Sequence, residues 1–90
     1  MTHVGIGWYR KDQWEDLRRI ATDKERIEKT WEEWIAVAEK NMIELMKEGY
    51  TPQKVPVDVS ELELWCKTSG KQCDGKARAE YITRQLRAKG

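Results

Sequence analysis

The chain has 90 residues, a formal net charge of +1 and a mean hydropathy of −0.87. A chain of this length supports one hydrophobic core, so we treat residues 1–90 as a single domain. No apolar run approaches the roughly 20 residues of a membrane span, and the N-terminal segment lacks a basic region followed by an apolar stretch. We therefore expect a globular cytoplasmic protein that does not bind or enter a membrane.

Charge is distributed unevenly along the chain. Residues 1–66 carry 10 Lys/Arg against 14 Asp/Glu, a net −4, whereas residues 67–90 carry 7 against 2, a net +5. The C-terminal quarter can therefore form a basic patch, although an asymmetry of this size is also common on ordinary solvated helices.

The first elements are a short extended segment and a helix. Residues His3–Tyr9 mix β-branched and aromatic side chains with two glycines, which favours a strand or an extended lead-in. Asp12 and Glu15 have the spacing of a capping box, so a helix is predicted to begin at Asp12. Its apolar residues recur at intervals of three and four: Trp14, Leu17, Ile20 and Ala21. The polar stretch 22–29 then separates this helix from the next.

The second helix has the clearest pattern in the chain. Thr30 and Glu33 form a capping signature, and a helix is predicted over Trp31–Glu48. It ends at Gly49, because glycine readily adopts the left-handed conformation that terminates helices. The apolar residues of this helix fall within one narrow arc: Trp31, Trp34, Ile35, Ala38, Met42, Leu45 and Met46. Such a stripe must be buried against another element.

A turn at 50–52 leads to a candidate strand. Residues 54–59 alternate apolar and polar side chains like a half-buried strand, but Pro56 confines such a strand to a sheet edge.

Two further helices follow. Overlapping capping boxes at Asp58 and Ser60 predict a third helix that ends at Gly70 and carries Val59, Leu62, Trp65 and Cys66 on its inner face. Asp74 is placed to cap a fourth helix that continues through Lys89, with Ala79, Ile82 and Leu86 facing inward.

Together these elements predict an α+β domain that is mostly helical. It has four helices, and residues 4–9 and 54–58 are available to pair as a minimal two-stranded sheet. Two helices lie between these segments, which allows a parallel crossover, and a sheet of two strands depends on helix packing for its stability. An all-α architecture is the alternative.

Five tryptophans and no phenylalanine distinguish the composition. Tryptophan buries a large area and needs only one partner for its indole N–H, so core packing is the preferred interpretation for the group. Tryptophan is also enriched in binding hot spots. Trp8 and Trp31 are therefore the candidates for an exposed anchor that binds a protein partner or a second copy of the chain.

Cys66 and Cys73 do not have the two-residue spacing of redox or zinc cysteine pairs. A metal site would need two further ligands, and His3 is the only histidine. We expect no metal or cofactor, with Cys66 as a small core residue and Cys73 as a loop thiol; a regulatory disulfide is the less favoured alternative in a reducing compartment.

Catalysis is not expected. A nucleophilic triad could recruit only His3, and the pair Gly5 and Gly7 lacks both the third glycine and the lysine of a phosphate-binding loop. The carboxylates cluster where helix caps and exposed helix faces use them.

Nucleic-acid binding is the alternative function. The basic C-terminal segment 67–90 contributes the candidate phosphate contacts Lys67, Lys71, Lys76, Arg84 and Arg87. Glu80 lies four residues from both Lys76 and Arg84, which instead favours an ion-paired, solvated face.

The segments Thr30–Trp34 and Val57–Cys66 resemble short bacterial proteins without an assigned function, and the resemblance covers most of the chain from Trp8 onward. It implies a domain that stands alone in a bacterial cytoplasm, and it implies no catalytic or binding residue.

Taken together, these sequence features predict a non-enzymatic interaction module that uses an exposed indole or apolar surface beside the second helix.

Overall fold

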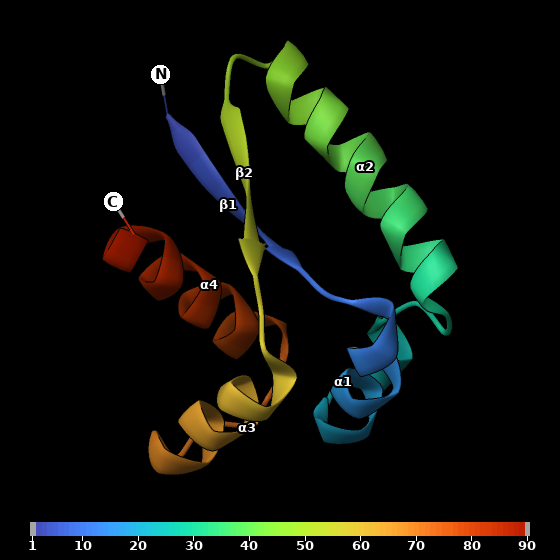
Figure 1. The fold of residues 1–90 in the computed structure, drawn as a ribbon, viewed down its shortest axis with the longest axis vertical. Coiled ribbons are helices and arrows are strands. Elements are labelled where there is room, and N and C mark those ends of the chain that lie inside the picture. The colour runs from blue at the N-terminus through green and yellow to red at the C-terminus, as the bar shows by residue number, and fades with distance from the viewer. Residues whose placement is uncertain (1, 90) are drawn as a thin grey trace.

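The structure, a computed structural model, describes residues 2–89 and has the α+β, mostly helical architecture that the sequence predicts (Figure 1). Its elements are β1 (His3–Trp8), α1 (Trp14–Ile20), α2 (Trp31–Lys47), β2 (Thr51–Pro56), α3 (Val59–Thr68) and α4 (Gly75–Lys89). Short 3-10 turns at Lys11–Gln13 and Lys24–Arg26 precede and follow α1. Within residues 2–89, no helix combines the length and apolar character needed to cross a membrane.

The two strands form a parallel sheet that lies between α2 and α4 (Figure 1). Alternate residues of β1 face opposite sides of the sheet. Gly5 and Gly7 face α4, where a Cβ on either glycine would meet Ile82. Trp8 faces the other side and packs against Trp34 of α2. Helix packing on both faces supplies the burial that a two-stranded sheet cannot supply alone.

β2 begins at Thr51, three residues before the predicted strand, although it contains Pro52 and Pro56. The Thr51 amide donates to the Thr2 carbonyl just before β1, and the Val57 amide donates to the Trp8 carbonyl at the end of β1. The odd-numbered amides therefore face β1 and the even-numbered backbone nitrogens face outward. Both prolines therefore occupy outward positions, where the missing N–H breaks no bond to β1.

Most helix termini follow the predicted capping chemistry. Thr30 accepts a hydrogen bond from the Glu33 amide at 3.1 Å, Asp58 accepts from the Ser60 amide at 2.9 Å, and Asp74 accepts from the Ala77 amide at 2.9 Å. Each side chain satisfies an amide that the first helical turn leaves without a backbone partner.

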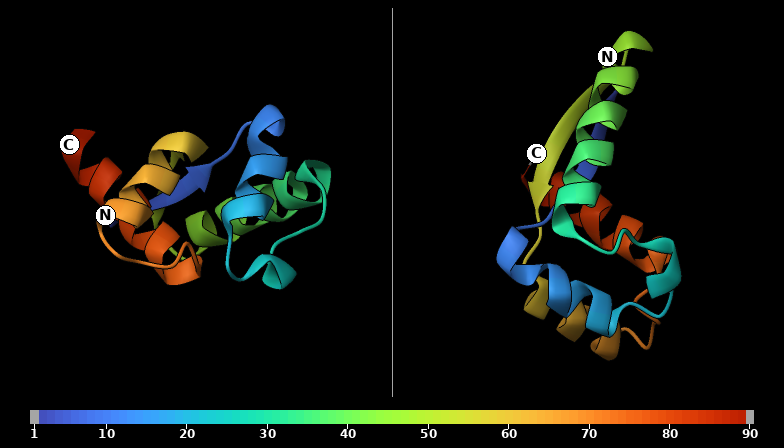
Figure 2. Two further views of the ribbon diagram at one scale, coloured as in Figure 1. Left: turned by 90° about the horizontal axis from the view of Figure 1, so that it is seen from below. Right: turned by 90° about the vertical axis from the view of Figure 1, so that its right-hand side faces the viewer.

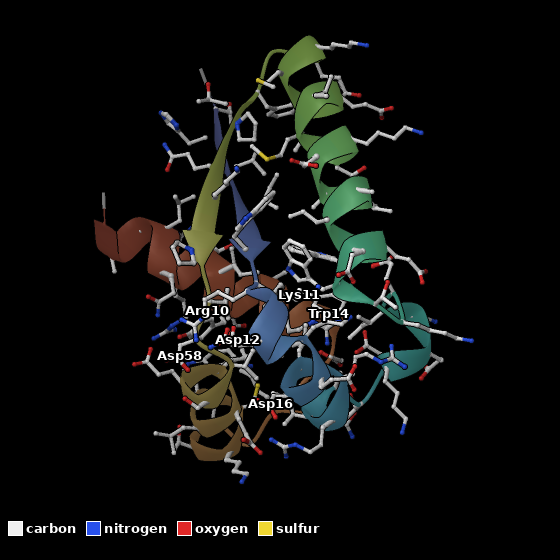
Figure 3. All side chains as sticks on the ribbon, turned by 45° about the vertical axis from the view of Figure 1, so that its right-hand side comes forward. Arg10, Lys11, Asp12, Trp14, Asp16 and Asp58 are labelled. Carbon is white, nitrogen blue, oxygen red and sulfur yellow. The ribbon has the colours of Figure 1, made fainter. Side chains whose placement is uncertain are left out.

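The prediction that Asp12 caps the first helix is wrong. Its carboxylate accepts from Arg10 Nε at 3.1 Å, beside the start of α1 (Figure 3). The 3-10 turn Lys11–Gln13 replaces the expected first helical turn, and Gln13 is buried within it. When the Gln13 side-chain amide is oriented so that its nitrogen and its oxygen both have partners, it donates to the Val57 carbonyl at 2.9 Å and accepts from Arg10 at 2.9 Å. The bond to Val57 ties this turn to the chain that leaves β2.

Both predicted glycine stops are confirmed. Gly49 and Gly70 have φ angles of 93° and 67°, in the region that favours glycine. The Tyr50 amide donates to the Leu45 carbonyl at 3.0 Å, and the Lys71 amide donates to the Cys66 carbonyl at 2.9 Å. These are the six-to-one bonds of Schellman motifs, which satisfy carbonyls at the ends of α2 and α3.

The hydrophobic core lies where α1, α3 and the start of α4 meet the C-terminal ends of the strands (Figure 2). Its buried members include Trp14, Leu17, Leu62, Cys66 and Tyr81. The predicted inner face of the fourth helix is only partly correct, because Ala79 is exposed whereas Ala77 and Tyr81 are buried.

Candidate interaction surface

An aromatic cluster forms where α2 begins. Its members are Trp8, Tyr9, Trp14, Trp31 and Trp34. The Trp34 ring centroid lies 5.3 Å from that of Trp8, 5.5 Å from that of Tyr9 and 5.2 Å from that of Trp14. These distances are within the range of favourable aromatic pairs. One side chain of α2 thereby joins β1, the segment after it and α1.

The two predicted anchors, Trp8 and Trp31, are both half-buried. Trp31 belongs to the cluster, and its indole N–H donates to the Tyr9 carbonyl at 2.9 Å. Trp8 packs edge-on against Trp34, and the Lys54 ammonium lies 4.3 Å from the centroid of its ring, within cation–π distance. Both rings therefore contribute to packing within the chain, and their role as anchors stays a prediction.

The solvent-facing surface of α2 exposes several large apolar side chains. Ile43 and Met46 are 51% and 54% exposed, and Val37 is 45% exposed at another angle of the helix. Residues three apart in a helix are neighbours, so Ile43 and Met46 form one apolar patch. The sequence placed Met46 on the inward stripe, and the structure places it at the solvent-facing margin of that stripe.

This exposure follows from the position of α2 in the fold. The core lies near the N-terminal end of α2, whereas the C-terminal half runs alongside the strands and away from α1 and α3 (Figure 2). Ala38 is the only buried residue of α2, so this helix has only a narrow inner face. The flank that carries Ile43 and Met46 has no neighbouring element among the described residues to cover it.

Two charged residues accompany the patch. Glu39 and Lys47 lie four residues before and four residues after Ile43, so all three side chains lie along one ridge of the helix surface. Both charged side chains are exposed, and neither forms an ion pair with another described residue. We refer to Glu39, Ile43, Met46 and Lys47 as the α2 flank.

The basic C-terminal segment presents its candidate residues unevenly. Lys67 forms an ion pair with Glu63 and Lys71 with Glu80, each at 3.6 Å, so carboxylates offset two of these cations. Lys76, Arg84 and Arg87 are exposed on α4.

Cys66 and Cys73 are both free and buried. The sequence predicted a packing role for Cys66, which belongs to the core, and a loop thiol at Cys73, which joins the same core cluster. Burial raises the pKa of Cys73 to about 12, and the adjacent Cys66 thiol adds to this effect. A thiol in this state is a poor nucleophile at neutral pH.

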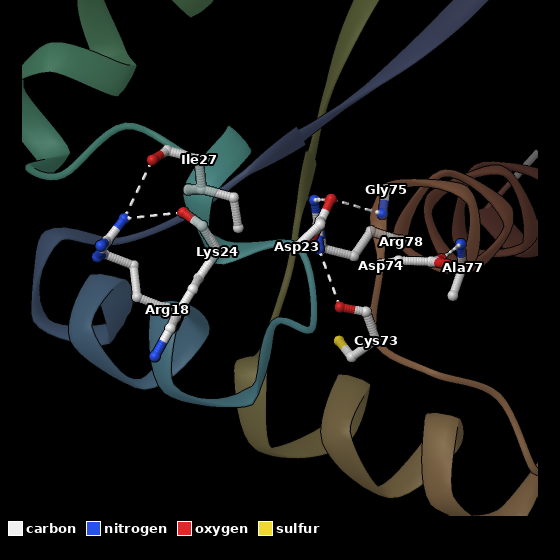
Figure 4. A network of polar contacts seen from close by, with 9 residues as sticks. All are labelled: Arg18, Asp23, Lys24, Ile27, Cys73, Asp74, Gly75, Ala77 and Arg78. Carbon is white, nitrogen blue, oxygen red and sulfur yellow. Dashed lines mark hydrogen bonds and ion pairs between the residues drawn. The ribbon is translucent and has the colours of Figure 1, made fainter.

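A partly buried ion pair holds the start of α4 against the loop after α1 (Figure 4). Arg78 donates to both carboxylate oxygens of Asp23, at 2.8 Å and 3.0 Å, and to the Cys73 carbonyl at 3.0 Å. The hydrogen bond from Arg78 holds the pKa of Asp23 below its usual value. Asp23 also accepts from the Gly75 amide at 3.1 Å. Every interaction of this network is internal to the fold.

Among residues 2–89, no three His, Cys, Asp or Glu side chains gather in a group that could hold a metal ion. His3 instead contacts the Gln53 side chain at 3.0 Å.

Comparisons with protein-family models, with curated proteins and with solved structures found no match to this chain. The sequence pattern favoured an exposed indole or apolar surface beside the second helix, with Trp8 and Trp31 as the candidate anchors. The spacing of Glu39, Ile43, Met46 and Lys47 was the available signal for the α2 flank, because it places apolar and charged residues on a second stripe beside the inward one.

Proposed function

We propose that the chain is a small, non-enzymatic protein-interaction module of the bacterial cytoplasm and that it binds its partner through the α2 flank. The observation that carries this proposal is the adjacent pair Ile43 and Met46, each more than half exposed. Single exposed apolar residues are common on protein surfaces, but a contiguous apolar patch rimmed by charges is typical of a contact surface.

A helix that presents such a stripe binds by laying it against a groove or another helix. The half-buried indoles Trp8 and Trp31 lie at the other end of α2, and we assign them to the packing that holds this helix on the sheet. Pairing of Lys67 and Lys71 with carboxylates makes segment 67–90 the weaker candidate surface, so nucleic-acid binding remains the second choice.

Site-directed photocrosslinking in cells tests the proposal. A photoreactive residue at position 43 is expected to give a discrete crosslinked species that disappears when Met46→Glu is added. The same residue at position 37 is the matched control, because Val37 is similarly exposed on α2 but lies outside the flank. Mass spectrometry then identifies the product, and its binding is measured with purified components. The absence of a product from position 43, or identical products from positions 43 and 37, would contradict the proposal.

A further inference from the structure

The charges of the α2 flank have a symmetry that points to a particular partner. Glu39 and Lys47 lie at equal distances in sequence on either side of Ile43. If a second α2 runs antiparallel across the first with both Ile43 side chains at the crossing point, residue 43 + k of one copy lies level with residue 43 − k of the other, and residues on the ridge through Ile43 face each other. Glu39 of each copy then faces Lys47 of the other, and both pairs are attractive.

On the basis of the proposed function, we infer that the partner is a second copy of this chain and that the two α2 helices pack antiparallel about a two-fold axis at Ile43. The proposed contact is isologous, which means that the same surface of each copy binds its counterpart on the other copy. In this arrangement Glu39, Ile43 and Lys47 form one ridge on each helix, and the two ridges run alongside each other in opposite directions.

The neighbouring residues fit the same arrangement. Met46 lies to one side of Ile43 around the helix, so the Met46 side chains of the two copies lie on the same side of the crossing point and extend the apolar contact there. Ala36, one turn further along the helix, is small enough to allow close approach of the helices. Antiparallel helices also place opposite ends of their macrodipoles side by side.

The contact is small. Three turns of helix bury less than the roughly 1,200 Å² of a standard stable interface, so the dimer is weak and reversible. Its dissociation constant is expected in the range of about 10 µM to about 1 mM. Because the Glu39–Lys47 pairs are at the rim, association weakens as ionic strength rises.

Sedimentation equilibrium across this concentration range tests the inference on the purified full chain. Ile43→Ser is expected to weaken association at least about tenfold. Val37→Ser, on the same helix but outside the contact, is expected to leave it unchanged. Both residues are exposed, so neither change removes a core side chain; circular dichroism checks that each variant is folded.

A charge exchange gives the decisive result. Glu39→Lys and Lys47→Glu each place like charges opposite one another at both ends of the contact and should each weaken association about tenfold. The double variant E39K/K47E restores opposite charges in both pairs, and its association should return to within about threefold of the unaltered chain. A heterologous partner gains no such rescue.

A monomer at all concentrations, or folded single variants that associate normally, would overturn the antiparallel dimer. So would a double variant that remains as weak as the single variants. These outcomes are distinct from failure of the proposed function: a position-43 crosslink to a different protein would retain the α2 flank as a binding surface while rejecting the second copy.

Discussion

At the scale of single residues, the Asp23–Arg78 ion pair is the ion pair whose loss should lower the free energy of unfolding most. Its side chains are 19% and 13% exposed, and it spans 55 positions of the chain. Surface ion pairs are far more exposed to solvent. In the Asp16–Arg19 pair, the side chains are 59% and 62% exposed and 3.7 Å apart. Exposed pairs contribute little because water and salt screen them.

Asp23→Asn is therefore expected to lower the free energy of unfolding by about 2 kcal/mol at pH 7. The pKa of Asp23 is lowered by the hydrogen bond from Arg78, so its contribution is present above the unfolded value of about 4 and is lost as pH falls through the folded pKa. Urea unfolding at a series of pH values should show the two proteins converging below about pH 4. Asp16→Asn, the control, should change stability by less than about 0.5 kcal/mol throughout. An undiminished difference in acid would contradict the assignment to the charged carboxylate.

At the scale of elements, local chemistry predicted more than packing geometry did. Thr30, Asp58 and Asp74 act through amides within three residues, and Gly49 and Gly70 act through their own φ angles, so the sequence contains the necessary information. The 3-10 turn found in place of the Asp12 cap contains Gln13, which is bonded to the Val57 carbonyl, a partner distant in sequence. The inward face of α4 likewise depends on where the sheet and α3 lie, which periodicity alone does not encode.

The approach of α4 to β1 provides a test at this scale. A Cβ at position 7 would collide with Ile82 Cδ1, so Gly7→Ala is expected to lower the free energy of unfolding by about 1–2 kcal/mol. Ile82→Val removes that methyl group and alone should lower it by about 1 kcal/mol. Denaturant unfolding of the double variant should show a loss smaller than the sum, because the two sites are in direct contact. Strict additivity would mean that α4 and β1 do not approach this closely.

At the scale of the whole molecule, the aromatic cluster joins α2 to the hydrophobic core, because Tyr9 and Trp14 belong to both. Trp34 contacts rings from β1, the following segment and α1, whereas Trp65 pairs with Tyr81 between α3 and α4 at 5.5 Å. The cluster thus attaches the N-terminal end of α2 to the rest of the chain, and α2 also packs along β2. The residue spacing indicates a second stripe on α2, but it does not determine how exposed that stripe is, because its exposure depends on the core lying near only one end of α2.

Trp34→Ala is expected to lower the free energy of unfolding by about 3–5 kcal/mol, a large fraction of the total for a small domain. Trp65→Ala, the matched control, should cost at least about 1 kcal/mol less, because its ring pairs with a single aromatic partner. Urea unfolding followed by circular dichroism measures both. Equal losses would show that Trp34 has no special role in joining the elements.

The two prolines of β2 have a consequence for how copies of this chain can meet. Along the outward side of Thr51–Pro56, the Lys54 amide is the single backbone donor, because Pro52 and Pro56 occupy the other outward positions. An incoming strand cannot form a regular ladder there, so growth of open-ended fibrils through this strand is blocked at its first step. At high concentration, copies of this chain therefore cannot extend the sheet outward from β2.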